Sequence, residues 1–315
     1  MANEVEMQTE TKYLFIVGAG HSGSTLLNFI LGNHSCVTSV GEIVNWDKYI
    51  ARNSYCSCGS YVRDCSLWSC VLTSWVEHTS ERPVESNSTD TRSDSIADFR
   101  NRLLQRISIV LMLLIPNKIL LKLPVSTFTA LNQISGNILD LFSFIHNTTG
   151  KPLICDSSKS VFRFRLIFWH QPNSTKAIYL TRDGRAVTAS AFKRLARDPV
   201  KTAKKWRFNN LYIQLMLKGI PENNKLQVRY EEICRHPEET LKRICDFADL
   251  PFEPAMLVFD HTQQHHIGGN RMRMEGVRNI KEDLKWKSIL SEDQLRKFDL
   301  IAGKLNKRLM GSYFR

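Results

Sequence analysis

The chain has 315 residues, of which 43% are hydrophobic, and carries a formal net charge of +12 at pH 7. A chain of this length can bury the core of one large domain. The positive charge favours anionic ligands: a nucleotide, an acidic acceptor or a membrane surface. The lysines and arginines are spread along the chain and form no basic block with interleaved aromatic residues. This distribution argues against nucleic acid as a partner.

The N-terminal residues 1–12 are polar and acidic, and the first apolar run, 13–17, ends at a glycine. Such a start lacks the basic and apolar regions of a secretory signal. The most apolar segment, 107–125, is interrupted by prolines and lysines and is therefore a poor membrane span. We expect a cytoplasmic protein without a membrane span, whose charge still allows association with a membrane surface.

The apolar run 13–17 predicts a strand, which leads through a loop of glycine and hydroxyl residues into an apolar helix. Backbone N–H groups and a helix N-terminus directed at one point form an anion site. The sequence therefore predicts a phosphate-bearing ligand at residues 18–25.

This loop fits more than one kind of phosphate site. Gly18, Gly20 and Gly23 have the spacing of a dinucleotide fingerprint, and Glu42 follows at about the expected distance. That interpretation predicts an NAD(P)-dependent oxidoreductase. A nucleoside-triphosphate loop, by contrast, requires a lysine at the start of the helix, and this loop has none. A further possibility is a phosphosulfate loop, in which hydroxyl groups donate to anionic oxygens.

A second strand-to-helix transition discriminates between these interpretations. The run 177–181 predicts a strand that ends at Arg182, and Asp183 is suited to cap the helix that follows. Ser190 and Arg194 are four residues apart and share one face of that helix. Two guanidinium groups and a hydroxyl on one patch favour a bound dianion, and a dinucleotide fingerprint leaves this face without a role.

Together, residues 13–34 and 177–194 resemble the two cosubstrate signatures of the sulfotransferases that use 3′-phosphoadenosine 5′-phosphosulfate (PAPS). The resemblance implies that Arg182 and Ser190 bind the 3′-phosphate, and that Arg194 matches a basic position of the tyrosylprotein branch. It further implies that the first loop holds the 5′-phosphosulfate, through Gly20, His21, Ser22, Gly23, Ser24 and Thr25.

Two later segments extend the resemblance. Residues 228–242 are similar to the family's next strand, loop and helix, and residues 268–273 are similar to a late loop that covers the nucleotide. The resemblance implies contacts to adenine or ribose phosphate from Tyr230, Asn270 and Arg271.

The family's catalytic residues match three positions of this chain. Glu42 stands where the tyrosylprotein branch has its catalytic glutamate, which implies a general base. Lys159 resembles the lysine that neutralises charge on the leaving oxygen. His21 departs from the pattern, because many relatives have Arg or Lys there; it either donates to the leaving phosphate oxygen or packs beside the loop. His265 and His266 are weaker candidates for the base.

Four of the eight cysteines lie close together in the sequence, at Cys56, Cys58, Cys65 and Cys70. Their spacing is compatible with zinc, with a disulfide pair or with reduced structural thiols, because Cys-x-Cys is tighter than the usual zinc knuckle. Similar Cys-x-Cys-Gly runs occur in bacterial relatives of the family. The remaining four cysteines are isolated and suit small core positions.

Strands are predicted near 13–17, 37–40, 152–155, 177–181 and 226–230, separated by loops and helices. This alternation predicts an α/β fold with a central parallel sheet flanked by helices, and the resemblance implies the P-loop-like sulfotransferase fold. We expect a single domain over 1–315. Residues 80–150, with helices near 96–122 and 127–147, break the pattern. They predict a helical insertion, either over the acceptor site or as an ordinary packing subdomain.

The sequence thus predicts a PAPS-dependent sulfotransferase that requires no metal and works by in-line transfer. Its expected acceptor is a hydroxyl or amine of a small molecule or natural product. The alternatives are a peptide tyrosine or a glycan as acceptor, an NAD(P)-dependent oxidoreductase, a kinase-like phosphotransferase, and a nucleotide-sensing module without turnover.

Overall fold

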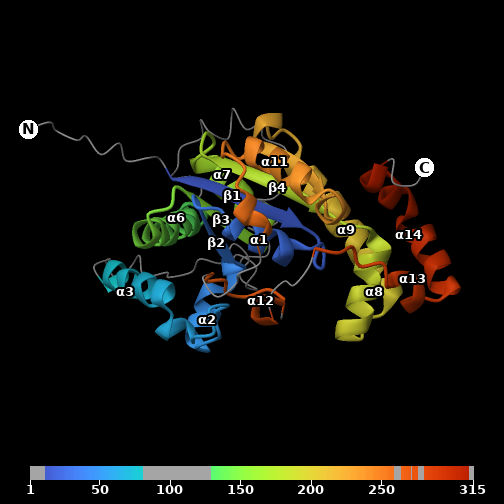
Figure 1. Ribbon diagram of the computed structural model, residues 1–315, viewed down its shortest axis with the longest axis horizontal. Coiled ribbons are helices and arrows are strands. Elements are labelled where there is room, and N and C mark those ends of the chain that lie inside the picture. Colours follow the sequence, from blue (N-terminus) through green and yellow to red (C-terminus); the bar gives the residue numbers. More distant parts are fainter. Residues whose placement is uncertain (1–10, 81–128, 259–263, 271, 276–279, 312–315) are drawn as a thin grey trace, which may run out of the picture.

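The computed structural model describes residues 11–80, 129–258, 264–270, 272–275 and 280–311 (Figure 1). Five strands form one sheet in the order β2-β3-β1-β4-β5, and every neighbouring pair is parallel. Their bounds are β1 Lys12–Gly18, β2 Val37–Gly41, β3 Leu153–Lys159, β4 Thr175–Thr181 and β5 Lys225–Arg229. The predicted strands and the predicted fold class are thereby confirmed. The order differs from the 3-2-1-4-5-6 order of dinucleotide-binding sheets.

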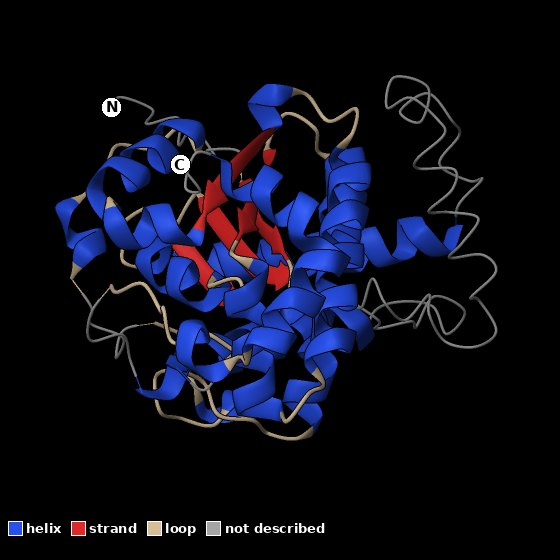
Figure 2. Cartoon of the chain, turned by 90° about the vertical axis from the view of Figure 1, so that its right-hand side faces the viewer, coloured by secondary structure: helices blue, strands red, loops and turns tan. Residues whose placement is uncertain are grey.

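Helices cover both faces of the sheet, as Figure 2 shows. Alternation along β1 produces this arrangement, because successive side chains point to opposite faces. Leu14 and Ile16 join a core beneath α1 Ser24–Gly32, α10 Tyr230–Arg235 and α11 Pro237–Phe247. Phe15 and Val17 join the larger core on the other side. That core includes residues of α3 Ser66–Ser80, α6 Thr129–Thr149, α7 Val161–His170, α8 Gly184–Leu195, α9 Pro199–Leu217 and α14 Glu292–Met310.

Three short helices complete the α-helices of the described residues: α2 Trp46–Ala51, α12 Met272–Glu275 and α13 Trp286–Ile289. No helix of the described residues has both the length and the apolar character needed to cross a membrane.

The expected insertion at 80–150 is described only in part. Helix α6 confirms the helix predicted near 127–147, and Ile138, Leu141 and Phe142 on it are buried in the core against α3 and α7. The described part is therefore a packing element of the domain. The helix predicted near 96–122 lies outside the described residues, so a covering role for this segment stays a prediction.

Candidate active site

The predicted site residues meet at one edge of the sheet, because parallel strands present their carboxyl ends together. The loop 18–23 follows β1, Glu42 follows β2 and Lys159 ends β3. Arg182 follows β4 and Tyr230 follows β5. Each of the five strands thus contributes one feature that the sequence analysis singled out.

The loop after β1 has a backbone that few residues tolerate. His21 and Gly23 have φ angles of 64° and 92°, in the left-handed region. A Cβ atom on Gly23 would lie 2.3 Å from Cδ2 of Tyr230, so glycine is required here by both conformation and space. Gly20, in contrast, has open space where a Cβ would be. Helix α1 begins at Ser24, and its first N–H groups have no intrahelical partners and face the loop.

Buried polar atoms that form no hydrogen bond lie beside this loop. Among the described residues, the Ser22 hydroxyl and the Nε and Nη2 atoms of Arg182 are buried and accept or donate no hydrogen bond. Buried polar groups are normally satisfied, so unused donors at a helix N-terminus fit an anionic ligand. The residues therefore suit the phosphate groups of the nucleotide that the resemblance implies.

Arg182 is fixed in place by three neighbours. Its Nη1 donates to the backbone oxygen of His21 at 3.0 Å, and its guanidinium carbon lies 4.3 Å from the centre of the Tyr230 ring. The carboxylate of Asp283 lies 3.5 Å from Nη2 and places a negative charge next to the guanidinium group. Asp283 has no local sequence signal and was not among the predicted site residues. Tyr230 is held in turn, because its hydroxyl donates to the Lys281 oxygen at 3.2 Å.

Ser190 and Arg194 occupy the same face of α8, as predicted. The Ser190 hydroxyl lies 3.5 Å from Nδ1 of His21, and Nη1 of Arg194 donates to the Asn270 side chain at 2.7 Å. The late loop therefore reaches α8 through Asn270. Asp183 caps this helix by accepting from the Arg185 N–H at 2.8 Å, which confirms the predicted cap. Arg271 lies outside the described residues.

The electrostatics of this face keep His21 neutral. Burial, followed by the positive charges of Arg194, Arg197, Lys159 and Arg182, lowers the pKa of His21 to about 4. At pH 7 the imidazole therefore carries no charge and cannot replace the guanidinium or ammonium group that stands there in many relatives.

Glu42 and Lys159 form an ion pair next to the loop. Each side chain retains about a fifth of its exposure, so the pair borders solvent rather than the core. Lys159 has a φ angle of 66°, a costly conformation for a residue with a side chain, and such strain is concentrated at functional sites. The late loop closes over the pair: a Cβ on Gly269 would lie 3.2 Å from Oε1 of Glu42 and 3.6 Å from Oγ1 of Thr25.

A cleft of about 590 Å³ adjoins this cluster on the side of α8 and α9. It shares Gly20 and His21 with the loop, and Trp206, Lys201 and Lys205 belong to its α9 wall. Its lining includes neither Glu42 nor Arg182, so the cleft lies beside the anion cluster and not over it. Sequence reasoning missed this wall, because its lysines resemble ordinary surface residues of a helix.

Two weaker predictions about the site need correction. His266 is fully buried and packs against Phe29, with ring centroids 4.5 Å apart, so it cannot contact an acceptor. His265 lies 3.1 Å from the sulfur of Cys65, among thiols rather than beside Glu42. Cys70 is exposed on α3 and does not join the other three cysteines of its sequence cluster.

Comparison with known proteins found similarity over parts of the chain. Residues 125–254 match the model of the sulfotransferase family. The chain is 26% identical to protein-tyrosine sulfotransferase A of Caenorhabditis elegans, over 56% of this chain and 49% of that protein. It is 30% identical to a putative protein-tyrosine sulfotransferase of Caenorhabditis briggsae, over 42% of this chain and 50% of that protein. The chain thus spans about half the length of these curated relatives.

Solved structures with a similar fold cover almost the whole chain. The sulfotransferase domain of the Synechococcus PCC 7002 olefin synthase superposes with a TM-score of 0.51 at 19% identity, over 94% of this chain and 96% of that domain. The sulfotransferase domain of the curacin biosynthetic pathway superposes with a TM-score of 0.50 at 19% identity, over 94% of this chain and 97% of that domain. These similarities establish a shared fold.

Proposed function

We propose that this chain transfers a sulfuryl group from PAPS to a hydroxyl or amine of an acceptor, since residues 125–254 match the model of the sulfotransferase family. The observation that carries this proposal is the group of unsatisfied buried donors on Ser22 and Arg182, beside the N-terminus of α1. PAPS has two anionic groups, a 5′-phosphosulfate and a 3′-phosphate, and we assign one to the loop at Ser22 and the other to Arg182. When bound, it supplies the activated sulfuryl group.

The binding roles follow from position. The N–H groups and hydroxyls of Ser22, Ser24 and Thr25 are suited to the 5′-phosphosulfate, since they stand at the start of α1. Arg182, Ser190 and Arg194 are suited to the 3′-phosphate, because Ser190 and Arg194 share one face of α8 and both Arg182 and Ser190 contact His21. We assign Tyr230, Asn270 and Arg271 to the nucleoside side.

Glu42 is the proposed general base and accepts the proton of the acceptor hydroxyl. Lys159 pairs with Oε1 of this carboxylate, and a carboxylate has a second oxygen that can take up a proton. Uptake of the proton neutralises Glu42, so the positive charge of Lys159 becomes available to the leaving phosphate oxygen. His21, neutral and close to Ser190, is placed to donate a hydrogen bond to that oxygen. This chemistry needs no metal ion at the reacting centre.

The strand order and the Glu42–Lys159 pair both favour this proposal over the dinucleotide interpretation. A dinucleotide fingerprint would need Glu42 free for a ribose hydroxyl. It would also leave Arg182, Ser190 and Arg194 without a function.

For the acceptor we propose a small molecule or natural product with a hydroxyl group. The names of the curated relatives favour a second candidate, a tyrosine within a peptide. Lysines along the adjoining cleft would suit acidic residues that flank such a tyrosine.

Calorimetric titration with 3′-phosphoadenosine 5′-phosphate, and with NAD for comparison, tests the cosubstrate. We expect micromolar binding of the former and none of the latter; binding of NAD alone would overturn the proposal. Transfer of radiolabelled sulfate to a panel of phenols and to tyrosine peptides with acidic flanks then separates the two acceptor classes.

A further inference from the structure

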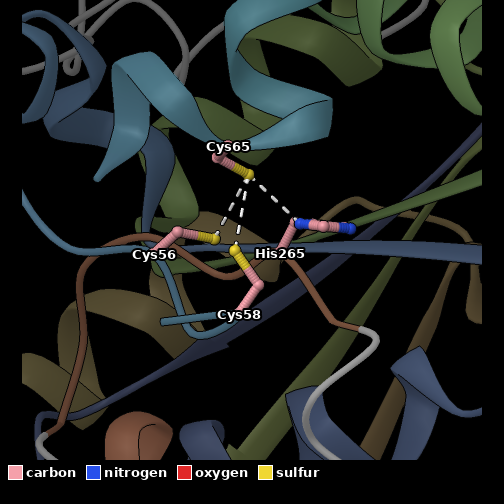
Figure 3. A group of neighbouring side chains, drawn as sticks. All are labelled: Cys56, Cys58, Cys65 and His265. Carbon is pink, nitrogen blue, oxygen red and sulfur yellow. Dashed lines mark hydrogen bonds between the residues drawn. The ribbon is translucent and has the colours of Figure 1, made fainter. Parts of the chain in front are cut away.

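Three cysteines and one histidine that the transfer chemistry does not use converge at one place. This Cys₃His cluster consists of Cys56, Cys58, Cys65 and His265. One potential ligand atom from each residue lies within 4.8 Å of all the others. Figure 3 shows the sulfur of Cys65 facing the two other sulfurs and the imidazole. The histidine is 200 residues away from Cys65 in the chain, so local sequence cannot have produced this meeting.

The spacing of the cluster matches that of a tetrahedral metal site. The sulfur of Cys65 lies 3.7 Å from the sulfurs of both Cys56 and Cys58, and 3.1 Å from Nδ1 of His265. Around zinc, with Zn–S bonds of about 2.3 Å, tetrahedral angles place neighbouring sulfurs about 3.8 Å apart. All eight cysteines are free thiols, so no disulfide competes for these sulfurs.

We propose that the Cys₃His cluster binds one Zn²⁺ ion in a structural site. Thiolate and imidazole ligands in a tetrahedral arrangement select zinc over the hard cations magnesium and calcium. The protein supplies all four ligands, and the sulfurs of Cys56 and Cys65 are buried, which leaves no open position for a substrate or catalytic water. Binding releases the thiol protons to solvent, and the ion replaces them at sulfur.

The surrounding hydrogen bonds hold the ligands in this arrangement. The indole N–H of Trp68 donates to the backbone oxygen of His265 at 2.8 Å. The Ser57 hydroxyl, between the first two cysteines, donates to the Gln264 oxygen at 2.6 Å and accepts from the His266 N–H at 2.8 Å. Such outer contacts orient metal ligands. Because these hydrogen bonds fix both segments of the cluster, we do not regard the proximity of the four side chains as accidental.

The zinc site would fasten the late loop to the body of the domain. The loop of residues 56–65 and the segment 264–270 are joined by the cluster, and immediately after His265 the Ile267 oxygen accepts from the Glu42 N–H at 2.8 Å. Gly268 and Gly269 then cover the Glu42 side chain. A metal ion here sets the position of the segment that closes over the candidate base, without touching the reacting atoms.

Metal analysis of the purified full chain tests this proposal directly. By plasma mass spectrometry we expect about one zinc per chain after extensive dialysis. Replacement by Co²⁺ is expected to give the charge-transfer band of thiolate ligands and the intense visible bands of a tetrahedral site. Retention of no metal, or a cobalt spectrum without thiolate bands, would overturn the proposal, as would a disulfide between two cluster cysteines in peptide mapping.

Variants link the metal to these residues. Cys65→Ser and His265→Ala should lose most of the zinc, and Cys58→Ser, at a less buried position, offers a second test if the first variants fail to fold. Cys70→Ser is the matched control, because Cys70 is an exposed thiol of the neighbouring helix outside the cluster. Equal zinc content in Cys65→Ser, Cys58→Ser and Cys70→Ser would exclude the cluster as the site. Binding of 3′-phosphoadenosine 5′-phosphate, measured separately, distinguishes failure of this inference from failure of the proposed function.

Discussion

At the scale of single residues, Arg182 has the clearest assignment. Its side chain is buried, stacked on Tyr230 and anchored to the loop backbone, yet Nε and Nη2 donate to no described residue. Rigid placement with unused donors is typical of a residue that awaits an anionic ligand. The short-range pattern of strand, arginine and helix cap was enough to predict it.

Arg182→Ala should weaken binding of 3′-phosphoadenosine 5′-phosphate by about 10- to 100-fold, the effect of losing one charged hydrogen bond. Binding of adenosine 5′-phosphate should change much less, because that ligand lacks the 3′-phosphate. Calorimetry of both ligands measures this difference, with Arg207→Ala on the exposed side of α9 as control. Equal losses for the two ligands would exclude the assignment to the 3′-phosphate.

Glu42→Gln should lower turnover by about 10²-fold or more, the usual scale for losing a general base. Affinity for the nucleotide should stay close to that of the wild type, since the proposed role of Glu42 is toward the acceptor proton and not toward the nucleotide. The check is a single-turnover assay with radiolabelled sulfate donor, combined with a nucleotide titration. Near-normal turnover would remove Glu42 from the mechanism.

His21 predicts a pH dependence of stability. The pKa of His21 is about 4 in the folded protein and has its ordinary value of 6.5 in the unfolded chain, so between these pH values the unfolded chain binds more protons. This contribution to stability is therefore complete above about pH 6.5 and is lost as the pH falls toward 4. In urea unfolding at several pH values, the free energy of unfolding should fall less steeply with decreasing pH in His21→Asn than in the wild type. Asparagine is chosen because it tolerates the left-handed backbone. Parallel curves for both proteins would contradict the low pKa.

At the scale of elements, the junction of β1 and α1 creates the anion site. The strand delivers the chain to the sheet edge, the left-handed residues reverse it, and the helix presents its N–H groups. Gly23 is the critical residue, because its Cβ position is occupied by the Tyr230 ring.

Gly23→Ala should reduce both stability and nucleotide binding, because the new methyl group collides with Tyr230 and the positive φ costs about 1–3 kcal/mol. Gly20→Ala is the matched control: it lies in the same loop, and its Cβ would meet no atom within 4 Å. Thermal unfolding compares the two variants. If both unfold at the wild-type temperature, the tight contact with Tyr230 does not exist in solution.

At the scale of the whole molecule, the C-terminal helix α14 positions the first turn of α8. The Asn306 side chain accepts from the Gly184 N–H at 2.8 Å and donates to the Asp183 carboxylate at 3.1 Å. Phe298 occupies the space next to Gly184. The arrangement of Arg182 and Ser190 thus depends on a helix more than a hundred residues further along the chain.

Asn306→Ala should lower the free energy of unfolding by about 1–3 kcal/mol, because it leaves a buried N–H unsatisfied. It should also weaken nucleotide binding, although Asn306 is not a proposed ligand. Lys304→Ala, an exposed position on the same helix, is the control for helix propensity. Chemical denaturation and calorimetry check both effects, and unchanged binding in a destabilised Asn306→Ala protein would separate α14 from the site.

Much of the fold and of the nucleotide-binding edge could be predicted from the sequence, because their signals are local. The continuous apolar run 13–17 predicts a strand, and the runs ending at Gly18 and Arg182 predict strand ends. Parallel connections then bring these ends to one edge of the sheet. The cap at Asp183 and the shared face of Ser190 and Arg194 follow from helical geometry alone.

Only the tertiary structure decided which distant residues meet. Asp283 lies against Arg182, and Glu42 pairs with Lys159. The fourth member of the thiol cluster is His265, and Cys70 lies outside the cluster. Such contacts arise from packing between elements far apart in the chain, and no local spacing encodes them. The low pKa of His21 has the same origin, because it depends on burial and on positive charges supplied by other elements. The sequence by itself determined the elements and their order, and the packing of those elements determined the chemistry of the site.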